Sequence, residues 1–257
     1  MGKLDMKALF IGHGSPLNAI RDNRYAAFLR DLGERLPRPE AILVVSAHWQ
    51  TEGTRITAGA APEQIYDFYG FPDELYAVRY APPGHPELAR EIARAIPGVE
   101  LDETRGIDHA GWAPVSRIYP KADVPLLELS LDYAKSAREH YEFGKRLSLL
   151  ADRGVLVIGS GNAVHNLGDI AFDEEARPFG WALEADAWIA KRIADGTDGE
   201  LVEYRSRMPV WRRAIPTDEH FLPLLYALAT RSRGDSVRTL YEEIQNGSVS
   251  MRSIEVA

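Results

Sequence analysis

Four histidines lie at points of the chain where a sheet protein can gather a metal site. His13, His48 and His165 each follow an apolar, strand-length run, and His220 opens a segment that has the pattern of a helix. In open α/β sheets, functional groups gather at the edge where parallel strands end. Because imidazole is the commonest side-chain metal ligand, the four positions together predict a metal enzyme.

Small residues surround the first and third of these histidines. His13 lies in Gly12-His-Gly-Ser-Pro16, where glycine on both sides permits a tight turn and a close approach to a ligand. This turn has a purely structural reading as well, but it lacks the lysine and the spacing of a phosphate-binding loop. His165 follows Gly159-Ser-Gly-Asn-Ala-Val, and we expect Asn162 to orient an imidazole or to bind a substrate oxygen.

Of the remaining histidines, some are candidate functional residues and others are structural. His48 ends a hydrophobic strand, and His220 would lie in the first turn of a helix capped by Thr217 or Asp218. His109, next to Asp108, is a fifth candidate. His85, in a proline-rich turn, and His140, inside an expected helix, are set aside as structural.

Composition excludes several kinds of chemistry. The chain has no cysteine, which rules out disulfides, thiolate zinc sites and a cysteine nucleophile. A formal net charge of -8 argues against nucleic-acid binding. Ser160 lacks the glycine at position 158 that a G-x-S-x-G nucleophile motif needs. The N-terminus has no long apolar stretch, and no apolar run is long enough for a membrane span, so we expect a cytoplasmic protein.

The elements that must position these histidines alternate between strand and helix. Unbroken apolar runs predict strands over 7–12, 41–47, 124–131 and 154–159, and helical patterns lie over 23–36, 86–96, 136–151 and 178–194. This order predicts an α/β fold with a central, largely parallel (mixed) sheet flanked by helices. We expect one domain over residues 1–257, with residues 248–256 as an edge strand.

The segment 50–85 breaks this pattern and is rich in glycine, proline and aromatic residues. Five aromatic residues stand within Ile65–Tyr76. Long irregular segments in compact domains are usually functional or disordered. This one is too aromatic for disorder, so we interpret it as a pocket wall or lid.

Read together, six motifs resemble one known family. They are GHGSP at 12–16, SAHW at 46–49, YDFYGFP at 66–72, DHAGW at 108–112, GSGNAVHNL at 159–167 and PTDEHFLPL at 216–224. They span most of the chain and resemble the 4,5-DOPA extradiol dioxygenase-like group of the class III extradiol ring-cleaving dioxygenases. The resemblance implies O2-dependent cleavage of a catechol, such as DOPA, to a ring-opened semialdehyde.

The resemblance also implies one non-haem divalent metal per chain. His13, His48 and His220 match ligand positions, and His165 lies at the metal or directly beside it. A carboxylate from Asp218 or Glu219 remains an alternative third ligand, because the familiar iron pattern has two histidines and one carboxylate. We expect Fe(II) for activity, since zinc has no redox chemistry, although zinc can occupy such a site in a crystal.

Roles for the other residues follow from the same resemblance and from side-chain chemistry. His165 is expected to act as the base, and His109 to contact substrate or oxygen. Tyr66, Phe68, Tyr69, Phe71 and Trp112 are candidates for an apolar wall, and Asp67 for binding an ammonium group. Arg79 or Arg117 would meet a carboxylate. The aromatic cluster also has a purely structural reading, in which it packs the loop onto the core.

Two other functions fit the same histidines. One is a zinc-dependent hydrolase or lyase that activates water for attack on a small aromatic substrate. The other is a non-catalytic metal-binding relative. The expected partners are a small catechol and O2, with no nucleic acid and no membrane, in a monomer or homodimer.

Overall fold

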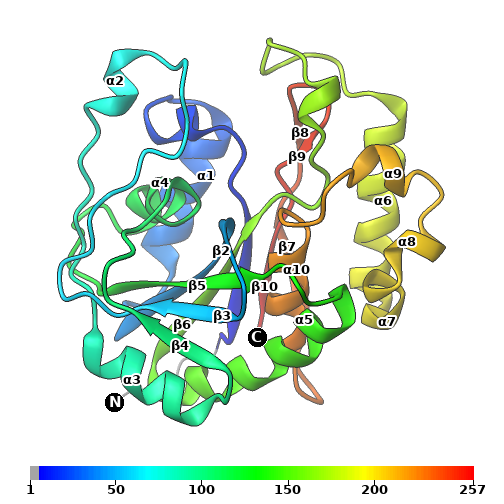
Figure 1. Cartoon of the computed structure of the whole chain (residues 1–257). Helices are drawn as coiled ribbons and strands as arrows, with labels where there is room; N and C mark the ends of the chain where they lie inside the picture. The colour runs from blue at the N-terminus through cyan, green and yellow to red at the C-terminus, as the bar shows by residue number, and fades with distance from the viewer. Residues whose placement is uncertain (1–5) are drawn as a thin grey trace.

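A mixed sheet of eight strands forms the centre of the computed structural model, which describes residues 6–257 (Figure 1). Residues 1–5, which the expected domain includes, lie outside the described residues. The strands are arranged, from one edge to the other, as β4 (Val99–Asp102), β3 (Thr54–Thr57), β5 (Leu126–Asp132), β2 (Ala41–Thr51), β6 (Val155–Gly161), β1 (Ala8–Gly12), β10 (Ser253–Val256) and β7 (Val237–Tyr241).

The four central strands are parallel. β2 pairs in parallel with both β5 and β6, and β6 pairs in parallel with β1. All four predicted strands are present, with bounds that differ from the predicted ones by a few residues. The predicted fold class, α/β with a largely parallel, mixed sheet flanked by helices, is therefore confirmed.

Helices cover both faces of the sheet, because alternate side chains of each central strand point to opposite faces. In β1, Leu9 and Ile11 pack toward α1 (Arg24–Arg35) and α4 (His109–Ile118). Ala8 and Phe10 pack toward the opposite core. That second core contains buried residues of α3 (Pro86–Ala95), α5 (Ala137–Gly144), α6 (Gly180–Asp195), α7 (Asp198–Val202), α8 (Tyr204–Arg207), α9 (Trp211–Ala214) and α10 (Leu222–Ala229).

The remaining elements are short. They are α2 (Asp73–Tyr76), the two-stranded ribbon of β8 (Ile244–Gln245) and β9 (Val249–Ser250), and the 3-10 helices η1 (Pro16–Ala19), η2 (Lys145–Arg153) and η3 (Leu167–Asp169). The predicted helix 136–151 is thus α5 followed by η2. No helix among residues 6–257 combines the length and apolar character needed to cross a membrane.

Two sequence predictions about the C-terminal half are wrong. β10 is not an edge strand, since it pairs with β1 on one side and with β7 on the other. The edge strand β7 is only half-buried or exposed, so its sequence lacks the apolar run of a core strand. His220 lies in a turn before α10, and Phe221 rather than Thr217 or Asp218 is the N-cap residue, without a side-chain cap.

The segment 50–85 contains β3 and α2 but is otherwise largely irregular. It runs from the end of β2 to the start of α3. In its middle, Phe68 packs against Trp112 of the α4 core, and Phe71 packs against Phe68. Phe68 and Phe71 therefore anchor this long segment to the domain.

We predict that Gly159→Ala destabilises the protein. A Cβ at Gly159, in the middle of β6, would lie 2.2 Å from the carbonyl oxygen of Pro223 at the start of α10. Overpacking of a core contact costs about 1–3 kcal/mol, and urea denaturation measures it. Gly180→Ala is the control, because a Cβ there meets no atom within 4 Å. Equal stabilities of the two variants would contradict the close packing of α10 on β6.

Candidate metal centre

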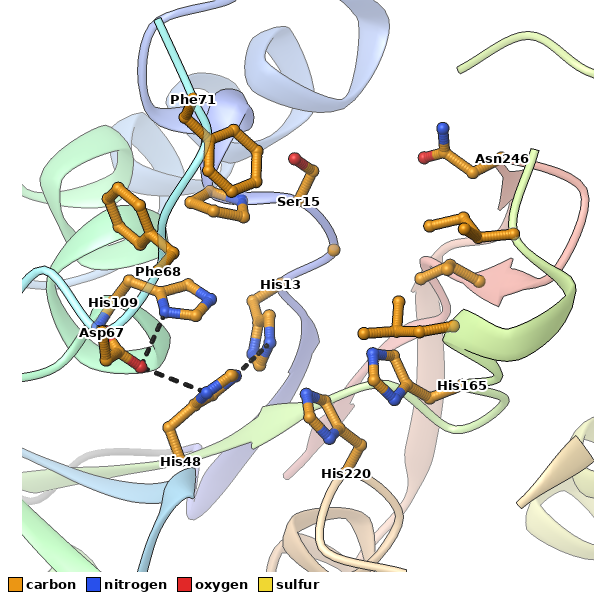
Figure 2. Close-up of a pocket in the computed structure, with 15 residues that line it drawn as sticks. His13, Ser15, His48, Asp67, Phe68, Phe71, His109, His165, His220 and Asn246 are labelled. Carbon is orange, nitrogen blue, oxygen red and sulfur yellow. Dashed lines mark hydrogen bonds and ion pairs between the residues drawn. The ribbon is translucent and has the colours of Figure 1, made fainter. Parts of the chain in front are cut away.

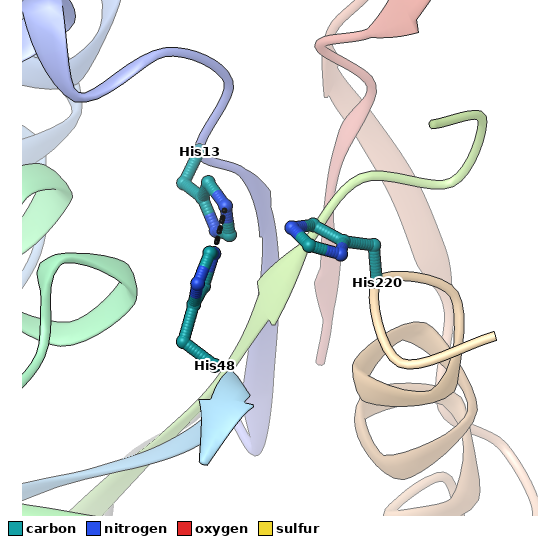
Figure 3. Close-up of side chains that lie close together, drawn as sticks. All are labelled: His13, His48 and His220. Carbon is teal, nitrogen blue, oxygen red and sulfur yellow. Dashed lines mark hydrogen bonds between the residues drawn. The ribbon is translucent and has the colours of Figure 1, made fainter. Parts of the chain in front are cut away.

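Three histidines converge from different elements at one edge of the sheet (Figure 3). His13 follows the last residue of β1, and His48 lies near the end of β2, where the register with β5 shifts between Val45 and Gln50. His220 projects from the turn before α10. One ligand atom from each of the three lies within 4.8 Å of the others.

A serine fixes the tautomer of His13. Nδ1 of His13 lies 3.0 Å from Oγ of Ser160, and that hydroxyl donates its hydrogen to the carbonyl of Ala110 at 2.6 Å. Ser160 therefore accepts from His13, so Nδ1 carries the hydrogen and Nε2 presents a lone pair. Ser160 thus orients the ring of His13 and leaves Nε2 free to bind a metal.

A carboxylate fixes the tautomer of His48. Nδ1 of His48 lies 3.1 Å from Oδ2 of Asp67. Burial raises the pKa of Asp67, but its hydrogen bonds with His109 and His48 outweigh burial and hold that pKa well below the usual value. An ionised carboxylate only accepts hydrogen bonds. The hydrogen of His48 is therefore on Nδ1, and its Nε2 also presents a lone pair.

The arrangement repeats at His220, whose Nδ1 lies 3.0 Å from Oε1 of Glu219. Nε2 of His13 and Nε2 of His48 face each other at 3.4 Å, with no hydrogen between them to share. Lone pairs brought this close repel one another unless a cation lies beside them. The donor set, three imidazoles each held by a hydrogen bond on the other nitrogen, therefore fits a divalent metal.

Burial favours the neutral form of His13 and His220, which is the form that binds metal. Burial lowers the pKa of His13 and of His220 well below the ordinary value, and the neighbouring histidines lower both further. A protonated ring in this cluster would face other imidazoles with little water to screen it.

Two other groups of side chains have ligand atoms close enough for a metal, and each includes a carboxylate. They are His48 with Asp67 and His109, and His165 with Glu219 and His220. In both groups the carboxylate oxygen already accepts a hydrogen bond from an imidazole Nδ1. Asp218 is bonded to Tyr204 and Arg205 instead. The geometry thus favours the three-histidine group.

His165 lies beside this group. Its ring stacks on the ring of His220, with centroids 3.6 Å apart and planes 11° from parallel. Its backbone amide donates to the carbonyl of Ala214. Burial lowers the pKa of His165, followed by the effect of His220, so this ring also is a neutral acceptor at neutral pH.

His109 is held by Asp67 from two directions. Its Nδ1 lies 2.9 Å from Oδ2, and its backbone amide donates to Oδ1. Burial and His48 lower the pKa of His109 despite the contribution of Asp67. Asp108, the neighbour of His109 in the sequence, caps α4 at the amide of Ala110 and accepts from Ser46.

A cavity of about 240 Å³ opens above the histidines (Figure 2). Asp67, Phe68, Phe71 and His109 form one wall, and His165 and Asn246 lie on the opposite wall. The other lining residues are Gly14, Ser15, Pro16, Leu167, Ile170 and Val249, together with the three converging histidines. The cavity therefore joins the three converging histidines to an aromatic wall.

Several expected substrate contacts lie outside this lining. Trp112 is fully buried and donates to the carbonyl of Ile65, and Tyr66 donates to the carbonyl of Val78. Asn162 instead holds the site together, accepting from the amide of Gly14 and donating to the carbonyl of Ser250. Tyr69 is 92% exposed. Trp112, Tyr66 and Asn162 therefore support the walls from behind, whereas Tyr69 faces solvent.

The two arginines considered for a substrate carboxylate are also engaged elsewhere. Arg79 donates to the hydroxyl of Tyr66 and to the carbonyl of Tyr76. Arg117 donates to the carbonyls of Asn18 and Arg21. Neither lines the cavity.

Sequence reasoning missed the tautomer-fixing roles of Ser160, Asp67 and Glu219. It also missed the second wall, which comes from η3 and the β8–β9 ribbon, at Leu167, Ile170, Asn246 and Val249. For Glu219 the signal was its place next to His220. No local pattern marks the others, because their partners are far away along the chain.

Comparison with known proteins identifies relatives over nearly the whole chain. Residues 8–252 match the family described as the catalytic LigB subunit of aromatic ring-opening dioxygenase. The chain is 41% identical to the 4,5-DOPA dioxygenase extradiol of Escherichia coli K12, covering 100% of this chain and 96% of that protein. It is 36% identical to the protein of the same name from Beta vulgaris, covering 96% and 95%.

A solved structure supports the same relationship. The crystal structure of an uncharacterized protein from Escherichia coli K12 superposes with a TM-score of 0.85 at 36% identity. The match covers 98% of this chain and 100% of that one.

We predict that Asp67→Asn weakens metal binding. Asparagine has one acceptor oxygen in place of two, so its NH2 group would face either the backbone N–H of His109 or the ring N–H groups of His109 and His48. The hydrogen bond that orients His48 is therefore weakened or lost. Loss of such a partner typically costs about 10- to 100-fold in metal affinity, which titration calorimetry with Zn(II) measures. Asp73→Asn, at an exposed position of α2, is the matched control. Unchanged affinity in Asp67→Asn would remove Asp67 from the metal site.

We also predict that the metal-free protein loses stability in mild acid. The pKa values of His13, His165 and His220 are lowered in the folded chain. The unfolded chain therefore binds more protons once the pH falls below about 6.5, and the free energy of unfolding decreases from there. Urea denaturation with a chelator between pH 7.5 and 5.5 measures this. His13→Asn should flatten the profile, and an equally steep profile would contradict the assignment.

Proposed function

The chain belongs to the LigB family of aromatic ring-opening dioxygenases and is an extradiol ring-cleaving enzyme, and we propose that it cleaves a catechol with O2 to a ring-opened semialdehyde. The observation that carries this proposal is the convergence of His13, His48 and His220 beneath an aromatic-walled cavity. The relatives' names, which specify DOPA, make L-DOPA the first substrate to test.

Fe(II) is the metal that we propose for these three histidines. When bound there, Fe(II) supplies the redox chemistry between catechol and O2 that zinc, a d¹⁰ ion, lacks. Three neutral imidazoles leave the full dipositive charge uncompensated by the protein. The donor set therefore favours a catechol that has lost both of its hydroxyl protons.

His165 is proposed to take one of these protons. Its ring lies on the cavity wall and stacks on His220, and burial keeps it neutral and able to accept. His165 lies outside the group of His13, His48 and His220, which favours the role of a base beside the metal over that of a metal ligand. An imidazole with a pKa near or below the working pH returns the proton readily at a later step.

His109 and Asp67 are proposed as a second proton-holding pair. In the neutral ring, Nδ1–H donates to Asp67, so Nε2 accepts a hydrogen bond from a substrate hydroxyl. Once Nε2 holds a proton, the Asp67 carboxylate stabilises the imidazolium, and Nε2–H becomes a donor to an oxygen in the cavity. A single ring thus accepts in one state and donates in the other.

The aromatic wall is proposed to orient the substrate ring and exclude water. The rings of Phe68 and His109 meet edge to face, with centroids 5.5 Å apart, and Phe71 packs on Phe68 at 5.3 Å. A flat substrate ring therefore meets an apolar surface on the side nearest His109.

Oxygen uptake tests the proposed function. Protein loaded with Fe(II) without oxygen should, on addition of L-DOPA and air, consume one O2 for each yellow ring-opened product formed. The zinc-loaded protein should consume none. The absence of O2 uptake with every catechol of a panel would contradict the proposed function. It would favour a zinc-dependent hydrolase, which takes up no O2.

We predict that His165→Ala lowers kcat by about 10²- to 10⁴-fold, the usual contribution of a general base, while zinc affinity stays near that of the wild type. Steady-state O2 uptake and zinc titration measure the two effects. His85→Asn, at the N-cap of α3 and outside the cavity, is the control. A loss of zinc affinity comparable to that of His13→Ala would instead make His165 a ligand.

A further inference from the structure

The cavity beside the histidines offers no cation to a substrate side chain. Apart from the histidines and Asp67, its lining within the described chain consists of Gly14, Ser15, Pro16, Phe68, Phe71, Leu167, Ile170, Asn246 and Val249. None of these is lysine or arginine, and their only polar side chains are those of Ser15 and Asn246. The wall opposite the phenylalanines is largely aliphatic.

Two arginines that are linked to this wall by hydrogen bonds are paired with carboxylates. Arg213 donates to Asp169, which lies between Leu167 and Ile170, at 2.7 Å. Arg21 pairs with Glu174, whose backbone carbonyl accepts from the amide of Asn246. Each guanidinium group therefore already has an anionic partner, and neither arginine lines the cavity.

The one carboxylate of the lining is engaged as well. Both oxygens of Asp67 accept hydrogen bonds, Oδ1 from the backbone amide of His109 and Oδ2 from the rings of His109 and His48. An ammonium group that approached Asp67 would compete with the bonds that hold these two rings. The cavity therefore has no anion dedicated to a substrate cation.

We infer that the cavity selects catechols whose ring substituent is short, apolar and uncharged, in preference to DOPA, whose side chain carries an ammonium and a carboxylate. This inference rests on the proposed function, in that the bound molecule is a catechol. Burying a charge without a partner is costly, whereas an alkyl group gains contact with Leu167, Ile170 and Val249. At about 240 Å³ the cavity is smaller than the roughly 300–1,000 Å³ of drug-sized sites.

Binding of a matched series to zinc-loaded protein tests the inference without turnover. The series is 4-propylcatechol, 3-(3,4-dihydroxyphenyl)propionate, dopamine and L-DOPA, which share a ring and a chain of similar length. Titration calorimetry should show 4-propylcatechol binding about 10- to 100-fold more tightly than L-DOPA, the range over which an apolar pocket discriminates. The values of kcat/KM for O2 uptake by the Fe(II) protein should follow the same order.

A charge placed on the aliphatic wall should change the order. Ile170 is 37% exposed, so Ile170→Lys can extend its ammonium into the mouth of the cavity. The affinity of the dihydroxyphenylpropionate relative to that of 4-propylcatechol should rise about twofold to fivefold, as expected for a partly exposed ion pair. Leu101→Lys is the control, because Leu101 is similarly exposed at 39% but lies on the edge strand β4, outside the cavity.

The outcomes separate this inference from the proposed function. Tight, selective binding of 4-propylcatechol without O2 uptake by the Fe(II) protein would support the inference and overturn the proposed function. L-DOPA that binds as tightly as 4-propylcatechol, or more tightly, would overturn the inference even if O2 uptake is robust. Failure of all four compounds to bind would overturn it too, as would an identical response of Ile170→Lys and Leu101→Lys.

Discussion

The site depends on the hydrogen bonds that hold Nδ1 of three imidazoles. Ser160, Asp67 and Glu219 each accept from one ring, so His13, His48 and His220 turn their Nε2 lone pairs toward one another. These lone pairs have no proton to share, and burial disfavours protonation of His13 and His220. Three nitrogen lone pairs therefore lie close together at the end of the sheet, and this arrangement suits the binding of a cation.

The fold makes this arrangement possible by bringing three elements together within a few ångströms. The ends of β1 and β6 deliver His13 and Ser160, and the irregular end of β2 delivers His48. The backbone of His220 lies against Gly161, where an added Cβ would be 2.1 Å from the His220 carbonyl oxygen. That carbonyl also accepts from the amide of Asn162. Close backbone packing therefore positions the third ring.

A buried polar network supports the opposite side of the site. Asp108 accepts from Ser46, two residues before His48, and from Arg105 at 2.9 Å. Its amide donates to Glu128, whose pKa burial and the nearby Asp108 raise well above the usual value. Asp67 then joins the metal site to the aromatic loop, because the same residue contacts His48 and precedes Phe68. A shift of this loop would change both the substrate wall and the orientation of a ring in the metal site.

The sequence by itself determined the central strands, the fold class and the histidines at the strand ends, because strand periodicity and apolar runs are local. Only the tertiary structure decided which side chains fix those histidines, and which residues form the second cavity wall. His13 and Ser160 are 147 positions apart, and no local pattern pairs them. The sequence predicted Asp67 and Trp112 at a substrate. Packing buried Trp112 completely, and Asp67, which lines the cavity, also bonds two imidazoles. β10 was misplaced at the edge because the exposed strand that covers it has no apolar signal. Local sequence sets which element forms, but the choice among hydrogen-bond partners is made by the burial of polar groups that meet only when the sheet and its helices close on one another.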